Sequence, residues 1–82
     1  MLTVEQLENL LRVLVRPLVE RPDRIEISGR EEGSRVRLTL RVADEDMGRV
    51  IGRQGRTINA IRKVVKAASV RLGKRVTVEV PD

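Results

Sequence analysis

The chain has 82 residues, which suffices for one domain, 1–82, and it contains neither cysteine nor histidine. Disulfides, thiolate sites, the commonest metal ligand and the commonest general base are therefore excluded, so we expect a non-enzymatic protein with no cofactor, no metal and no small-molecule substrate. The net charge of +5 is uneven, since residues 1–46 carry eight basic and ten acidic side chains and residues 47–82 carry nine basic and two acidic ones. Such a basic block indicates an anionic partner, most often nucleic acid, although a solvated face that keeps a small domain soluble is the alternative.

The first predicted element is an amphipathic helix at about 3–19. Thr3 and Gln6 match a capping box, and Pro17 should kink or end the last turn. Leu10 and Val13 widen the apolar stripe, which fits either core packing or a contact between subunits. The stripe itself follows spacings of three and four: Val4, Leu7, Leu11, Leu14 and Leu18.

Two alternating segments, 24–28 and 35–42, predict strands joined as a hairpin by the polar turn Gly29–Ser34. One face of the pair is apolar and the other carries arginines. We expect these arginines to pair with acids across the sheet. The apolar set is Ile25, Ile27, Val36, Leu38, Leu40 and Val42; the arginines are Arg35, Arg37 and Arg41, and the acids are Glu26 and Glu79.

Three acids, Asp44-Glu45-Asp46, open a short helical segment that ends at Ile51. We interpret them as acids at a helix start, with Asp44 as the cap, and not as a metal site, because no further acid completes an oxygen cage. A longer helix is predicted over 56–72, ended by Gly73, and a final strand over 75–80. The predicted order is therefore helix, strand, strand, helix, helix, strand.

The turn Gly52-Arg53-Gln54-Gly55 joins the two later helices. Its glycines permit positive φ and close approach, and it leads into a helix N-terminus, where free N–H groups and the dipole attract phosphate. Arg53 and Arg56 add positive charge there. A Gly-x-x-Gly turn alone is weak evidence, and a helix-turn-helix motif that binds DNA is an alternative interpretation. It is disfavoured because Ile58 and its neighbours on one helix face are committed to the core.

The stretch "VIGRQGRTI" resembles the signature of KH domains, a hydrophobic-Ile-Gly-x-x-Gly-x-x-Ile pattern. The element order is similar to that of the type II, prokaryotic form. Within it, "DMGRVIGRQGRTINAIRKVVKAA" and the ending "GKRVTVEV" resemble the small bacterial KhpA-type proteins. The resemblance covers essentially the whole chain. It implies an α+β fold, type II KH, in which a three-stranded mixed sheet packs on three helices and the last strand runs parallel to the central one.

The resemblance also implies a groove that holds about four nucleotides of single-stranded RNA. The turn would clamp the RNA backbone, an apolar floor would meet the bases, and two arginines would flank them. Zero aromatic residues predict weak binding of low specificity. The implied RNA-binding residues are Gly52, Arg53, Gln54 and Gly55 in the turn, Val50, Ile51 and Ile58 in the floor, and Arg49 and Arg56 at its flanks.

The resemblance further implies a homodimer, a heterodimer with a larger KhpB-like KH protein, and a role in RNA metabolism and cell-envelope growth. The leading hypothesis is an RNA chaperone or post-transcriptional regulator. The alternative is a protein–protein interaction module whose nucleic-acid groove is vestigial. Because no basic leader precedes an apolar segment and no apolar run reaches membrane-spanning length, we expect a cytoplasmic protein that does not contact a membrane.

Overall fold

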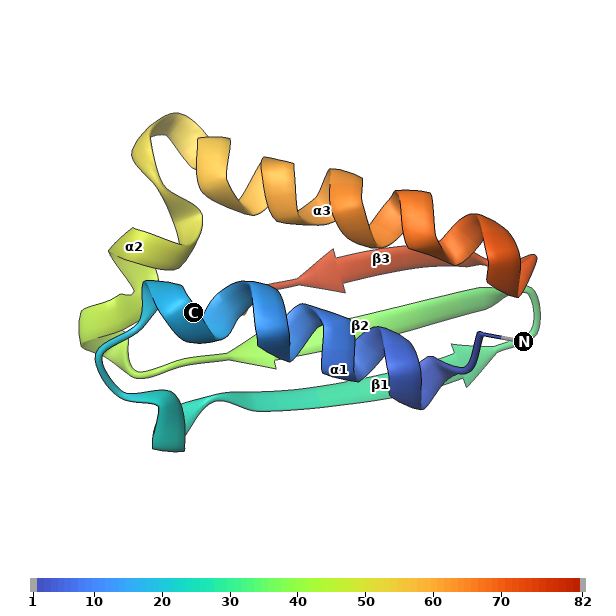
Figure 1. Ribbon diagram of the computed structural model, residues 1–82, viewed down its shortest axis with the longest axis horizontal. Helices are drawn as coiled ribbons and strands as arrows, with labels where there is room; N and C mark the ends of the chain where they lie inside the picture. Colours follow the sequence, from blue (N-terminus) through green and yellow to red (C-terminus); the bar gives the residue numbers. More distant parts are fainter. Residues whose placement is uncertain (1, 82) are drawn as a thin grey trace.

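A computed structural model describes residues 2–81. Over these residues, three helices and three strands follow one another in the predicted α-β-β-α-α-β order, joined by short 3₁₀ turns (Figure 1). The elements are α1 (Val4–Val15), β1 (Glu26–Glu32), β2 (Arg35–Arg41), α2 (Met47–Ile51), α3 (Arg56–Ser69) and β3 (Arg75–Glu79). Within the described residues no helix is both long and apolar enough to cross a membrane.

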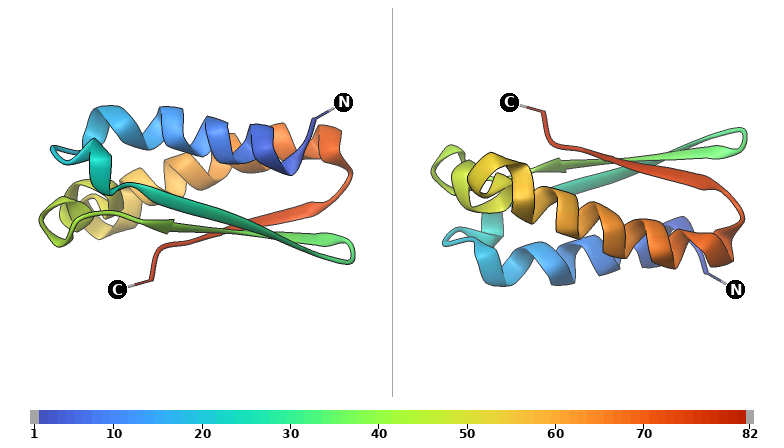
Figure 2. Two further views of the ribbon diagram at one scale, coloured as in Figure 1. Left: turned by 90° about the horizontal axis from the view of Figure 1, so that it is seen from below. Right: turned by 90° about the horizontal axis from the view of Figure 1, so that it is seen from above.

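The three strands form one sheet in the order β1-β2-β3. β1 pairs with β2 antiparallel, and β2 pairs with β3 parallel, which confirms the mixed sheet and the parallel last strand. All three helices lie on one face of this sheet, and the other face is open to solvent (Figure 2). The fold is therefore α+β with two layers.

The start of α1 is the predicted capping box. Thr3 Oγ1 accepts a hydrogen bond from Gln6 N at 3.1 Å, and Gln6 Oε1 accepts one from Thr3 N at 2.9 Å. The α-helix ends at Val15 and continues as a 3₁₀ turn over Arg16–Leu18. Pro17 explains the change because it has no N–H with which to extend the α-helical ladder.

The predicted turn over residues 29–34 is wrong. β1 continues to Glu32, and only Gly33 and Ser34 connect it to β2. Gly29 lies inside the strand, opposite Leu38 and beneath α1. A Cβ there would lie 2.8 Å from Val4 Cγ1 and from Glu8 Oε2, so the glycine permits close packing of helix on strand.

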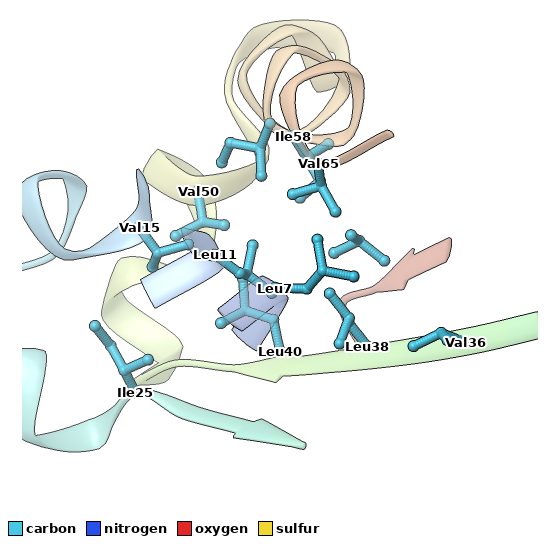
Figure 3. Close-up of a cluster of buried hydrophobic side chains, with 12 residues drawn as sticks. Leu7, Leu11, Val15, Ile25, Val36, Leu38, Leu40, Val50, Ile58 and Val65 are labelled. Carbon is cyan, nitrogen blue, oxygen red and sulfur yellow. The ribbon is translucent and has the colours of Figure 1, made fainter. Parts of the chain in front are cut away.

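The core is aliphatic and lies between the helices and the sheet (Figure 3). α1 contributes Leu7, Leu11 and Val15, and β2 contributes Val36, Leu38 and Leu40. Ile58, Ile61 and Val65 of α3 face them, as the helical spacing predicts. All nine of these side chains are buried. The alternating pattern of β2 and the helical period of α3 therefore identify correctly which of their residues face the core.

The prediction that Asp44 caps a helix is wrong. Asp44–Asp46 form a 3₁₀ turn, and the Asp44 side chain is exposed and makes no capping bond. Asp46 is instead 1% exposed and accepts hydrogen bonds from Glu20 N at 3.0 Å and Arg21 N at 3.1 Å. The carboxylate therefore ties the α1–β1 connection to the start of α2. The sequence places these groups 25 residues apart or more, so the local pattern could not show this bond.

On the open sheet face, Arg37 pairs with Glu79 at 3.6 Å, as predicted, and with Glu32 at 4.0 Å. Glu26 lies opposite Arg41 in the β1–β2 register, yet their side chains form no ion pair among residues 2–81. The predicted pairing across the sheet is therefore confirmed for Arg37, whereas Arg35 and Arg41 form no ion pair among residues 2–81. Both predicted acids do lie on this face beside arginines.

Candidate nucleic-acid interface

The loop between α2 and α3 has an unusual backbone. Gly52 and Gly55 have φ of +76° and +75°, and Gln54 has φ of +56°, the only positive value among the described non-glycine residues. α2 ends with a hydrogen bond from Gly52 N to Gly48 O at 2.8 Å, and the turn closes with one from Gly55 N to Gly52 O at 3.1 Å. The chain thus reverses between two helices within four residues.

The two glycines of this loop are needed for different reasons. A Cβ on Gly52 would lie 2.7 Å from Thr57 Cβ and 2.8 Å from Thr57 N, and still closer to the hydroxyl of the same threonine. Gly55 has more space, because the nearest atom to a Cβ there would be Asn59 Nδ2 at 3.7 Å. Gly52 therefore permits a close approach to α3, whereas Gly55 supplies only the left-handed conformation.

Positive charge is concentrated where α3 begins. Arg53, Gln54 and Arg56 are exposed, and neither arginine forms an ion pair among residues 2–81. The first N–H groups of α3 and its dipole add partial positive charge at the same end. Arg49 differs, because it donates to Glu20 with Nη2 and Oε1 2.7 Å apart. The loop therefore offers two free guanidinium groups to an anion, and Arg49 a third that is already paired.

The predicted apolar floor is mostly inside the protein. Val50 is 0% exposed and Ile58 is 3% exposed, and both pack in the core between α1 and the later helices (Figure 3). Ile51 is half-buried and keeps some surface. Val50 and Ile58 thus hold α2 and α3 in place, and of the three predicted floor residues only Ile51 offers appreciable surface.

A groove runs between α3 and β3, with walls that the sequence reasoning did not name. Its first part is a hollow of about 330 Å³ lined by Arg62, Lys66, Val76, Thr77 and Val78. A second hollow of about 330 Å³ shares Lys66 and Val76 and extends past Val70 and Lys74 to Arg75. Arg62 and Lys66 are four residues apart and so lie on one side of α3. This spacing is the sequence feature that could have indicated the helical wall of the groove. The strand that forms the other wall could not be assigned to this helix from spacing alone.

Arg62 is held in a fixed position within this groove. Its Nε donates to Val78 O at 3.1 Å, and its Nη1 donates to Asn59 Oδ1 at 3.2 Å. α3 begins at the Gly-x-x-Gly loop, and Arg62 follows about two helical turns later. α3 runs from the loop alongside β3 (Figure 1). The helix therefore connects the charged loop to the groove with aliphatic walls. This arrangement can hold a chain of negatively charged groups at the loop and flat apolar groups along the groove.

Comparisons with known proteins show which family the sequence resembles. A family model described as the KH domain of KhpA/KhpB matches residues 8–80. The RNA-binding protein KhpA of Clostridium acetobutylicum is 46% identical over 74 residues, which are 90% of this chain and 99% of the relative. The RNA-binding protein KhpA of Bacillus subtilis is 43% identical over 81 residues, 99% and 100% of the two chains.

Among solved structures, Era of Aquifex aeolicus superposes with a TM-score of 0.65 at 19% identity. The superposition covers 90% of this chain and 29% of Era. A second Era structure, a complex with a segment of 16S ribosomal RNA, superposes with a TM-score of 0.64 at 18% identity, over 92% of this chain and 29% of that one. At this identity the likeness shows the shared fold.

Proposed function

The chain belongs to the KhpA/KhpB family of KH domains, and from that premise we propose that residues 1–82 form one KH domain that binds single-stranded RNA. Its family relatives are named as RNA-binding proteins, which agrees with the expectation of a protein without enzymatic activity. The observation that carries the proposal is the Gly-x-x-Gly loop: a tight turn, two unpaired arginines and a helix N-terminus at one place.

The loop is suited to an RNA backbone. Gly52 and Gly55 present no side chain, so phosphates can approach the backbone between them. Arg53, Gln54 and Arg56 supply donors around that position, and Arg49 lies at its edge. These residues bind the phosphates, whereas Val50 and Ile58 keep the two helices at the right separation and Ile51 supplies apolar surface.

The groove between α3 and β3 receives the bases. Its walls are Val76 and Val78 on one side and the aliphatic stems of Arg62 and Lys66 on the other. Aliphatic contact without aromatic stacking gives weak, sequence-tolerant binding, because base stacking on aromatic rings contributes about 1–3 kcal/mol per base where it occurs. Such binding suits an RNA chaperone or post-transcriptional regulator in the cytoplasm, acting on many transcripts.

A second candidate function rests on exposed apolar side chains. Val13 is 68% and Val70 is 77% exposed, and Val64 is also exposed on α3. Apolar side chains at these positions favour a contact with another protein chain. We propose that they support a homodimer, or a heterodimer with a KhpB-like KH protein. If RNA binding fails, the protein–protein interaction module becomes the leading function.

The test changes Arg53 and Gln54 together to Asp. Both side chains are exposed, and aspartate tolerates the left-handed backbone of residue 54, so we expect the fold and the melting temperature to be retained. Two carboxylates would then face phosphate, and we expect binding of a short single-stranded RNA to be lost. Fluorescence anisotropy at two salt concentrations measures this, with circular dichroism as the check on folding.

A matched control distinguishes the loop from total charge. Arg24→Asp together with Asn9→Asp removes the same net charge at two exposed positions outside the loop and groove. We expect this control to retain most of the salt-sensitive binding. Equal binding by the wild type and the loop variant would instead mean that the basic surface attracts RNA non-specifically.

A further inference from the structure

The open face of the sheet has a hollow of about 400 Å³ at the end where β2 and β3 begin. Arg35, Arg37 and Arg75 line it, together with Thr77 and the acids Glu32 and Glu79. Arg35 and Arg75 are direct neighbours in the parallel β2–β3 register. Adjacent strands lie about 4.8 Å apart, so two guanidinium groups emerge side by side from the same face.

The charges in this hollow are only partly neutralised. Arg37 lies within ion-pair distance of both acids, Glu32 at 4.0 Å and Glu79 at 3.6 Å. Arg35 and Arg75 are exposed and form no ion pair within residues 2–81. Like charges directly opposite each other destabilise a sheet. A bound anion would remove that repulsion, and guanidinium forks match the geometry of phosphate oxygens.

The hollow shares two lining residues with the groove described above. Arg75 lines both the hollow and the far end of the groove, and Thr77 lines both the hollow and the near part of the groove. These two residues belong to β3, the edge strand that separates α3 from the open face. A nucleic-acid strand leaving the groove beside Lys74 and Arg75 therefore has to cross only this one strand to reach Arg35.

We propose that Arg35 and Arg75 form a second phosphate site, which binds the continuation of the same RNA strand after it leaves the α3–β3 groove. This proposal rests on the proposed function, because the RNA must first occupy the loop and groove. It extends the bound segment around the edge of β3 onto the open sheet face. RNA of about four nucleotides fills the loop and groove alone. Longer RNA reaches both sites.

The experiment compares an RNA of about four nucleotides with one of about ten nucleotides, on the wild type and on Arg35→Gln with Arg75→Gln. We expect the double variant to bind the longer RNA about tenfold more weakly, and its log–log salt slope to fall by about 1.4 for two lost phosphate contacts. Binding of the short RNA by Arg35→Gln alone stays unchanged, because Arg35 lines only the hollow, whereas Arg75 also lines the far end of the groove. Amide chemical-shift titration measures both affinities, and the amide of Arg35 should shift only with the longer RNA, because Arg75 and Thr77 also line the groove.

Two further variants make the result decisive. Arg24→Gln with Arg41→Gln removes the same charge from exposed positions outside the hollow, and should retain long-RNA affinity within about twofold. Glu32→Gln with Glu79→Gln releases Arg37 and should strengthen long-RNA binding about threefold.

The proposal is overturned if Arg35 and Arg75 can be replaced without loss of long-RNA affinity, if Arg35→Gln weakens binding of the short RNA as much as that of the long one, or if the Arg24 and Arg41 control loses as much as the double variant. Failure of the proposed function is a separate result: the loop variant with Asp at 53 and 54 would then bind both RNAs as the wild type does.

Discussion

Two basic surfaces of the molecule differ in the acidic side chains that neutralise their positive charge. The surface of α2, the loop and α3 belongs to a stretch with no acid between Met47 and Val78. Its acidic partners are few and come from other segments, as Glu20 does for Arg49. The open sheet face has arginines interleaved with glutamates of neighbouring strands, and Arg37 there contacts two of them. The positive field is therefore continuous on the first surface and interrupted on the second.

This difference shows that a count of arginines does not by itself identify a binding surface. On the sheet face, Arg37 is paired with two glutamates of neighbouring strands, whereas Arg35 and Arg75 line the corner hollow without an ion pair among residues 2–81. On the loop surface, the backbone itself is part of the site, because the glycines expose it and α3 begins there. Substitutions that change the backbone shape of the loop should thus have the largest effects on stability and RNA binding. Substitutions of single charges should have the smallest effects, on either surface.

The largest expected effect comes from Gly52→Ala. The new Cβ would overlap Thr57, and residue 52 would have to keep φ at +76° with a side chain. We expect a loss of about 2–4 kcal/mol in the free energy of unfolding, together with loss of RNA binding. Urea unfolding and anisotropy measure the two effects.

Gly55→Ala is the matched comparison for this prediction. Its Cβ meets nothing closer than 3.7 Å, so only the positive φ remains as a cost, about 1 kcal/mol. Equal losses for the two variants would contradict the view that Gly52 serves close approach and Gly55 only backbone conformation.

A smaller effect is expected at Asp46, which belongs to neither surface and ties the α1–β1 connection to the start of α2. Asp46→Ala leaves the N–H groups of Glu20 and Arg21 without their acceptor, which should cost about 2–3 kcal/mol of stability. RNA affinity should change little at temperatures where the variant is folded. Thermal unfolding followed by circular dichroism measures the stability. Asp44→Ala, at an exposed carboxylate without a capping bond, should change it by less than about 0.5 kcal/mol.

Asp46 also shows where reading the sequence reaches its limit. The order of elements, the mixed sheet and most of the core are predictable, because periods of 2 and 3.6 identify which residues of β2 and α3 face inward. The acidic triplet resembles a helix start locally, so the pattern favours Asp44. Burial of Asp46 depends on a chain segment 25 residues earlier, and no local period carries that information.

The candidate site is predictable to a similar degree. The Gly-x-x-Gly pattern identifies the loop, because glycine at both ends of a four-residue turn indicates positive φ. The structure has positive φ at both glycines. The groove is harder, because its two walls come from α3 and β3 and meet only in the folded chain. Gly29 is the converse case: a glycine in a polar stretch predicts a turn, whereas packing of α1 on β1 requires it in a strand.

The smallest expected effect sharpens the comparison at a single ion pair. Glu20→Gln removes the acid that holds Arg49, while Glu20 N can still donate to Asp46. Both side chains of the pair are more than half exposed, so stability should change by less than about 0.5 kcal/mol. The freed guanidinium lies on α2, three residues before Gly52, and we expect RNA to bind about twofold more tightly, with a steeper salt dependence. Arg49→Gln measured in parallel should weaken binding by a similar factor. If Glu20→Gln leaves both affinity and salt slope unchanged, Arg49 does not contribute to the loop surface, and the site begins at Gly52.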